Sequence, residues 1–440
     1  MKFMMIGKGL GMMTAICFVS GSVVSAQQDP LEQITAMEQR ITHLEARLAR
    51  YESRDNATQN QLSRVQRQVD SVRQKIDDVQ APSNGSLIAG IDMSVGATMV
   101  YQFTDKANGA SLSKNSEDVG DASYSVDLEF TKEFEDYGAA LVLFEAGEGA
   151  GVEDELQVFS NVNFDATGGD SNPGIVEAWY EQYMGSATLR FGKLDPTYLI
   201  DNNDYANDEA GQFLGRIFRN NPAVAFADNG VGVRLALAPH DRIEIESIAM
   251  DGDGDWDDVL EDLFYAGQVN VKANFWDRPG NYRFYAWASE ADHIKWDDGS
   301  QVKEDNYGFG ISFDQELTDD LGVFARYGWQ NPDVYAVGAS ESLEQSCSIG
   351  AQLAGRTWDR ENDVLGLALG MVIPSDEYKN SNSALKADTE RHLELYYSYM
   401  VNDHVTVSPD LQVIWDPYGG DAVNGDKTII VGGIRSQIDF

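Results

Sequence analysis

The sequence predicts an all-β transmembrane barrel of about 16 antiparallel strands, preceded by an α-helical coiled coil. Three observations carry this prediction. The N-terminus has the features of an export signal, and no later apolar run approaches the roughly 20 residues that a helical membrane span needs. Residues 34–79 keep a heptad pattern, and from residue 87 onward short segments alternate polar and apolar side chains. We therefore expect a signal peptide at 1–26, a coiled coil with its linker at 27–85 and a barrel at 86–440.

The first 26 residues have the parts of a signal peptide. Lys2 and Lys8 supply positive charge, an apolar stretch follows over 12–24, and Val24-Ser25-Ala26 provides the small residues of a cleavage site. After cleavage the chain keeps a single cysteine, Cys347, so the exported protein must fold without an intrachain disulfide.

The composition excludes one class of partner. Asp and Glu number 72 against 32 Lys and Arg, which gives a formal net charge of −40. Contacts to nucleic-acid phosphates need clustered Lys and Arg, so we expect no nucleic-acid partner. Many short alternating segments separated by acidic connections are instead typical of a barrel in outer-membrane lipid.

Residues 34–79 form one continuous heptad register, and 12 of its 14 core positions are apolar. The later half places β-branched residues at both core positions, which favours three helices and hence a homotrimer. The alternative is one long amphipathic helix folded back on its own barrel. The a positions are Ile34, Ile41, Leu48, Asp55, Leu62, Val69 and Ile76, and the d positions are Met37, Leu44, Tyr51, Thr58, Val65, Val72 and Val79.

The rest of the chain contains sixteen candidate strands, an even number as bacterial barrels require. Their connections alternate between long and short, so every tight turn falls at one end of the barrel. This asymmetry predicts long loops outside the cell and short turns in the periplasm, together with the coiled coil. The candidate strands are 87–103, 122–134, 138–146, 174–184, 186–194, 230–238, 242–250, 265–276, 281–290, 306–316, 320–328, 347–357, 363–372, 391–401, 404–414 and 428–440.

The alternation within strands predicts a wet lumen. In the candidate strand 265–276, Val269 and Val271 oppose Gln268 and Asn270. Across the strands, the polar sets hold too many charges and amides to pack a dry core, so they should line water while the apolar sets meet lipid. Sixteen strands leave an aqueous channel. We therefore expect passive diffusion of small polar solutes across a bacterial outer membrane.

Three stretches of the sequence resemble the carbohydrate-selective, OprB-type porin family. The order and spacing of these motifs are similar to that family across most of 87–440. The resemblance implies a passive channel for sugars or other small solutes, whereas the wide acidic loops depart from a dedicated sugar pore. The stretches are Gly192-Lys193-Leu194-Asp195-Pro196 with Gln212-Phe213-Leu214, then Glu394-Leu395-Tyr396-Tyr397 with Pro409-Asp410-Leu411-Gln412, and Asp416-Pro417 with Val431-Gly432-Gly433-Ile434-Arg435 and Phe440.

The connection 195–229 is the longest in the barrel and joins strands five and six. Loops of this length are usually functional, and we expect it to fold inward and narrow the pore. The alternative is an outer cap whose acids are solvated. Opposed charges across such a constriction would orient dipolar solutes. The expected pore-lining residues are Asp195, Asp201 and Asp208 on the loop and Arg190, Arg234, Arg283, Arg326 and Arg435 on the walls.

Two further motifs have alternative interpretations. Tyr285 and Trp287 lie on a polar strand face, where they would either stack on sugar rings or pack beneath the inward loop. The acidic run Asp251–Asp262 has the Asp-x-Asp-x-Asp core of a calcium loop, but Trp256 replaces its turn glycine. The run therefore indicates a solvated face or a loose divalent-cation site, and we expect no other cofactor or metal.

Catalysis is not expected. The five histidines, His43, His240, His293, His392 and His404, fall on separate predicted elements and assemble no nucleophile–His–acid group. Two other functions remain open. One is a structural tether that holds the outer membrane to the cell wall through the coiled coil, and the other is a substrate-specific uptake channel.

Overall fold

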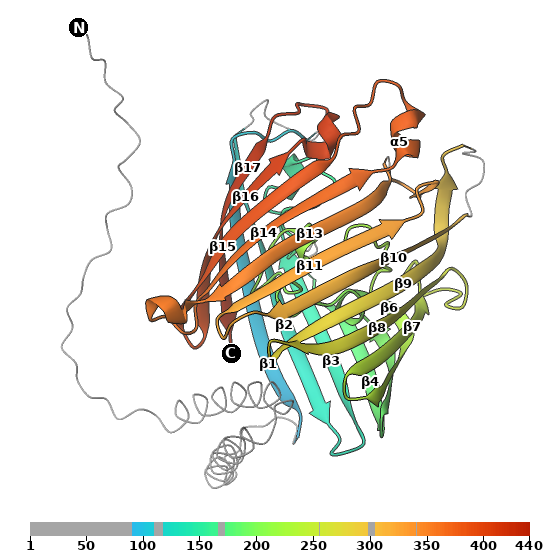
Figure 1. The fold of residues 1–440 in the computed structure, drawn as a ribbon, viewed down its shortest axis with the longest axis vertical. Coiled ribbons are helices and arrows are strands. Elements are labelled where there is room, and N and C mark those ends of the chain that lie inside the picture. The colour runs from blue at the N-terminus through green and yellow to red at the C-terminus, as the bar shows by residue number, and fades with distance from the viewer. Residues whose placement is uncertain (1–89, 110–117, 166–171, 255, 298–303, 340) are drawn as a thin grey trace, which may run out of the picture. The chain divides into compact units, whose positions relative to one another are not determined.

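The computed structural model describes residues 90–109, 118–165, 172–254, 256–297, 304–339 and 341–440. The signal peptide and coiled coil predicted within 1–85 lie outside these residues and stay predictions. The described residues form a closed β-barrel (Figure 1). None of their helices is long and apolar enough to cross a membrane.

Sixteen antiparallel strands make the barrel wall, and each pairs with its neighbour in the sequence of strands. β1 also pairs with β17, with Val100 opposite Arg435, which closes the sheet and leaves no unpaired edge. The strands are β1 Asp92–Thr104, β2 Val119–Glu133, β3 Gly138–Glu148, β4 Gly174–Met184, β5 Ala187–Leu194, β6 Gly230–His240, β7 Ile243–Asp251, β8 Leu263–Phe275, β9 Arg278–Lys295, β10 Glu304–Glu316, β11 Leu321–Gln330, β13 Leu343–Ala354, β14 Val364–Pro374, β15 Glu390–Asn402, β16 Val405–Trp415 and β17 Ile429–Asp439. A short additional strand, β12 Val334–Ala336, follows β11 and pairs with the end of β9.

All sixteen predicted strands are confirmed, with small differences at their ends. The prediction placed one strand at 347–357, but β13 ends at Ala354. It stops there because residues 355–358 form a 3-10 turn, in which the Gly355 N–H donates to the Asp363 carbonyl over 2.8 Å. β9 begins earlier and ends later than predicted.

The predicted alternation of long and short connections is also confirmed. At one end, tight turns such as 276–277 join neighbouring strands, and Trp276 and Asp277 both have positive φ there. This is the backbone of a two-residue hairpin, whose twist matches that of the strands. At the other end, the connections include 149–173, 195–229 and 416–428.

The strands alternate as the sequence indicates. On β8, Val269 and Val271 are exposed on the outer face, whereas Gln268 and Asn270 face inward and are buried. Because these inward polar side chains are buried, other parts of the protein must cover them. The long connections supply that cover, as described below.

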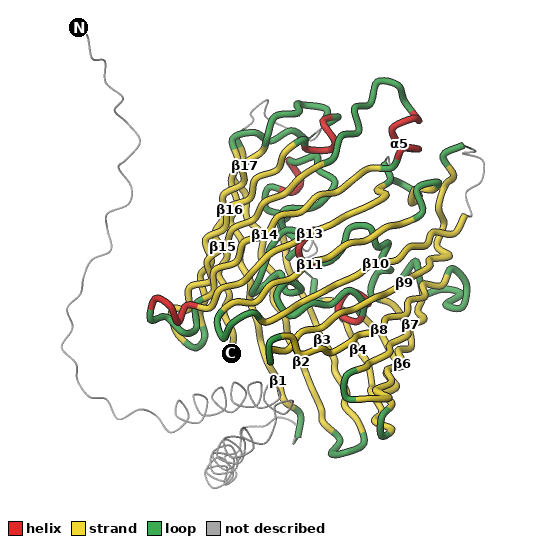
Figure 2. Tube along the Cα trace, viewed as in Figure 1, coloured by secondary structure: helices red, strands yellow, loops and turns green. Residues whose placement is uncertain are grey.

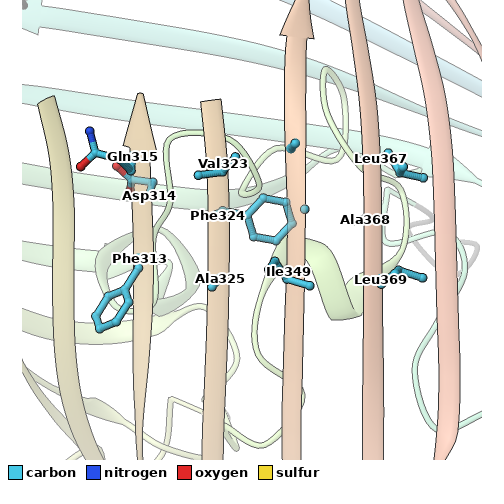
Figure 3. A pocket seen from close by; sticks show the side chains of 12 residues that line it. Phe313, Asp314, Gln315, Val323, Phe324, Ala325, Ile349, Leu367, Ala368 and Leu369 are labelled. Carbon is cyan, nitrogen blue, oxygen red and sulfur yellow. The ribbon is translucent and has the colours of Figure 1, made fainter. Parts of the chain in front are cut away.

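A hollow on the barrel wall belongs to the outer surface. It lies over β10, β11, β13 and β14 (Figure 3). Its exposed members, Ile349, Leu367 and Leu369, are aliphatic side chains that face away from the lumen. This hollow therefore lies on the outside of the barrel, away from the lumen.

Candidate functional site

The connection 195–229 lies inside the barrel, as predicted. It contains two short helices, α3 Pro196–Leu199 and α4 Arg216–Arg219. Figure 2 shows loop and helical segments between the strands of the barrel. The loop bonds to inward side chains of strands from β8 to β17, and Phe213 and Ile217 are fully buried against the walls. We call residues 195–229 the inward loop.

Two of the predicted wall arginines hold the inward loop in place. Arg326 on β11 forms an ion pair with Asp201, with 3.2 Å between Nε and Oδ2, and donates to the carbonyl oxygens of Asp201 and Phe218. Arg435 on β17 donates to the carbonyl oxygens of Glu209 and Gln212 over 2.6 and 2.9 Å. Both arginines are buried, so they anchor the loop and do not present their charge to open water.

The other three predicted arginines are paired with acids. Arg283 on β9 is buried and forms an ion pair with Asp314. Arg190 and Arg234 lie 2.8 and 3.4 Å from the same Glu181 carboxylate oxygen, and their side chains are 19% and 13% exposed. Of the five predicted arginines, Arg190 and Arg234 are therefore the two that are partly exposed to the lumen.

The three predicted loop acids have different roles. Asp195 caps α3, because its Oδ1 accepts from the Thr197 N–H over 2.8 Å. Asp201 is fully buried, and this burial raises the pKa of its carboxyl while Arg326 opposes the shift. Asp208 is exposed and accepts hydrogen bonds from the backbone of its own turn.

Two buried glutamates on β15 are anchors that the sequence reasoning missed. Glu394 accepts from the N–H groups of Leu214 and Gly215 over 2.7 and 2.9 Å. Glu390 accepts from Phe159 and other backbone N–H groups of two further connections, and from the His392 ring. A signal existed in the sequence, since acids at alternate inward positions of a strand need a buried partner.

Residues 149–165, which follow β3, also fold inward, which the sequence reasoning did not predict. Gln102 on β1 and Gln412 on β16 donate to the Val162 carbonyl oxygen over 3.2 and 2.7 Å. The two loops bond to each other, because the Phe164 N–H donates to the Leu214 carbonyl over 2.9 Å. We call residues 149–165 the second inward loop.

Arg219 of the inward loop is buried where the two inward loops meet. Its guanidinium lies 4.4 Å from the ring centre of Tyr198 and 5.3 Å from that of Phe164, and its Nε lies 2.7 Å from Glu209. Asp165, on the second inward loop, accepts from Ser125 over 3.0 Å. Burial raises the pKa of the Asp165 carboxyl to about 8.

The inward faces of β2 to β6 are less covered than those of β8 to β17. On β2 to β4 the half-buried inward residues include Asp127, Glu129, Glu145 and Glu177. Asp127 and Glu145 interact electrostatically with Glu209 of the inward loop. Acids of the inward loop do face arginines of the wall, because Asp201 pairs with Arg326 and Asp204 lies 3.5 Å from Arg283, but both arginines are buried. The buried arginines hold the loop from behind, and the face opposite the loop carries acids.

Tyr285 and Trp287 lie beneath the inward loop. Each is 4% exposed, and both pack in a cluster with Leu199, Ile200 and Val224. Neither ring face is open to the lumen, so these side chains pack the loop against the wall and do not present a stacking surface for sugars.

Comparisons with known proteins match part of the chain to a porin family. Residues 258–440 match the family described as carbohydrate-selective porins, OprB family. Porin B of Pseudomonas aeruginosa is 23% identical over 320 residues, which cover 60% of this chain and 68% of that protein. The chain is an outer-membrane porin, and its residues 258–440 match the OprB family.

Solved structures of porins share the fold. The high-pH structure of OprB from Pseudomonas putida has a TM-score of 0.67 and 16% identity, and the match covers 80% of this chain and 94% of that one. The outer-membrane channel DcaP of Acinetobacter baumannii has a TM-score of 0.51 and 11% identity, with 80% and 97% covered. Together with the family match and the porin relative, this fold describes a passive diffusion channel in the bacterial outer membrane.

The family that matches residues 258–440 is one of porins and not of enzymes. His392 is engaged by Glu390, and the His404 ring bonds to the Asp439 carbonyl oxygen. Within the described residues, no group of three or more His, Cys, Asp or Glu side chains is placed to hold a metal ion. The described part of Asp251–Asp262 therefore gives no support to a loose divalent-cation site.

Proposed function

We propose that solutes cross the barrel through a passage between the inward loop and the inward faces of β2 to β6, and that this loop narrows the pore. One observation carries the proposal. The inward loop is bonded to the opposite arc of the wall through Arg326, Arg435 and Glu394, while inward residues of β2 to β6 stay half-exposed. Asp195, Asp208, Arg190 and Arg234 would border this passage, and the buried arginines would fix its width.

We propose that the solutes include neutral carbohydrates. The family that matches residues 258–440 is described as carbohydrate-selective, which supports this proposal. The exposed ring of Tyr198 on the inward loop also offers an apolar surface beside charged groups. Aromatic rings with polar neighbours suit sugars, which have both apolar and hydroxylated faces.

Conductance of the purified protein in planar bilayers tests the passage. We expect discrete open-channel steps, and a dose-dependent reduction of current when glucose or a maltooligosaccharide is titrated at constant salt. A conductance that sugars do not reduce would favour general small-solute diffusion. If the purified protein showed no conductance, the proposed passage would be contradicted. The tether would then be favoured as the main role of the chain.

The N-terminal segments remain proposals. We propose that 1–26 is a signal peptide, that 27–85 is a periplasmic coiled coil with its linker, and that the barrel starts near residue 86. The heptad register of 34–79 supports a homotrimer, and a coil in the periplasm would also suit a second role as a tether to the cell wall.

Mass measurement in detergent tests the assembly. We expect a trimer for the full chain and a weaker trimer when 27–80 is deleted, because each barrel closes its own hydrogen bonds and folds without the coil. A strictly monomeric full-length protein would contradict the trimer. Cell envelopes that retain their attachment to the wall after the same deletion would contradict the tether.

A further inference from the structure

The basic side chains at the edge of the passage are each held beside an acid. Arg190 lies 2.8 Å from Glu181, and Arg234 forms ion pairs with Glu181 and Glu246. Arg219 of the inward loop is buried and is paired with Glu209 over 2.7 Å. Each basic charge thus has an acidic charge at contact distance, so these groups add little net positive potential to the passage.

The wall on β2 and β3 has no such balance. Asp127 and Glu145 are directly opposite each other in the register of these strands, and both face inward. Glu129 follows Asp127 on the same face. These three carboxylates form no ion pair with another described residue, and Asp195 and Glu209 of the inward loop interact with Glu145 from the other side.

We propose that the passage selects solutes by charge, with Asp127 and Glu145 as its main selectivity residues, so that cationic and amine-bearing solutes cross more readily than anionic ones. This inference rests on the proposed path between the inward loop and β2 to β6. A narrow passage with one sign of charge on its walls concentrates counter-ions and raises the barrier for co-ions. Neutral sugars would pass, whereas sugar acids and sugar phosphates would be disfavoured.

Reversal potentials in a potassium chloride gradient at about pH 8, where free carboxylates are ionised, test the selectivity. We expect the wild-type channel to favour K⁺ over Cl⁻. The double variant Asp127→Asn/Glu145→Gln should lower this preference at least ~3-fold, and Asp127→Lys/Glu145→Lys should turn it toward anions. The effect should weaken near 1 M salt, where the screening length is about 3 Å.

The matched control is Glu135→Gln/Asp136→Asn. It removes the same charge from the exposed turn that joins the same two strands, outside the lumen. We expect its ion preference to equal that of the wild type. An unchanged preference in Asp127→Asn/Glu145→Gln channels that still conduct would overturn the selectivity assignment while leaving the path intact. A wild type without conductance would instead contradict the proposed path itself.

Swelling of liposomes that contain wild-type protein tests the proposal without any variant. Glucosamine, glucose and glucuronate are similar in size and differ in charge. We expect glucosamine to enter at least as fast as glucose, and glucuronate to enter several-fold more slowly. Equal entry of glucosamine and glucuronate, or faster entry of glucuronate, would overturn the proposal even if the variants fail to fold.

Discussion

Replacing residues 200–212 by a short Gly-Ser linker should raise the single-channel conductance at least ~2-fold, because the narrowest cross-section would then be set by the barrel wall. The exchange removes Asp201, the ion-pair partner of Arg326, and Glu209, whose carbonyl oxygen accepts from Arg435. Planar-bilayer recordings at fixed salt measure the change. Sugar block should weaken at the same time, since larger solutes would no longer fit closely.

The control for this exchange is a deletion of 256–261, in the acidic connection between β7 and β8. Its residues are mostly exposed, and Leu260 is 82% exposed. We expect conductance close to that of the wild type. If the exchange of 200–212 also left conductance unchanged, the second inward loop or the wall would be the narrowest part, and the proposed role of the inward loop would be wrong.

The strands were predictable because their signal is local. Successive side chains of a strand point to the inside and the outside of the barrel in turn. Turns also have local markers, since the turn at 276–277 lies beside Asp277-Arg278-Pro279-Gly280 in the sequence. Bilayer thickness fixes the strand length, so errors were confined to strand ends. The largest among the described residues is at the end of β9, which was predicted to stop at residue 290 but continues to Lys295, because residues 293–295 pair with the short strand β12.

The lumen was less predictable because its contacts join residues far apart in the chain. The length of 195–229 indicated an inward loop, but no local pattern says that Arg326 and Arg435 point at its backbone carbonyls. The sequence shows an arginine on an inward face, and whether that face meets water or a loop depends on what fills the barrel. The second inward loop was missed for the same reason.

Glu394→Ala should loosen the inward loop from β15 and make the open channel noisier. The carboxylate accepts from the N–H groups of Leu214 and Gly215 in a fully buried position, and Asp410 of β16 interacts with the same carboxyl. Removing the carboxylate leaves two buried N–H donors without an acceptor, and each unsatisfied donor costs about 1–3 kcal/mol of stability. The loop regains freedom at a cost smaller than that of unfolding the barrel, whose strands stay paired.

Hydrogen exchange of 213–219 and the variance of the open-channel current measure this loosening. We expect faster exchange of the Leu214 and Gly215 amides and larger current fluctuations in Glu394→Ala, with the barrel strands still protected. Glu394→Gln is the matched variant, because its amide oxygen still accepts a hydrogen bond while the charge beside Asp410 is gone. It should lie closer to the wild type than to Glu394→Ala. Equal exchange in all three proteins would show that Arg326 and Arg435 hold the loop without help from β15.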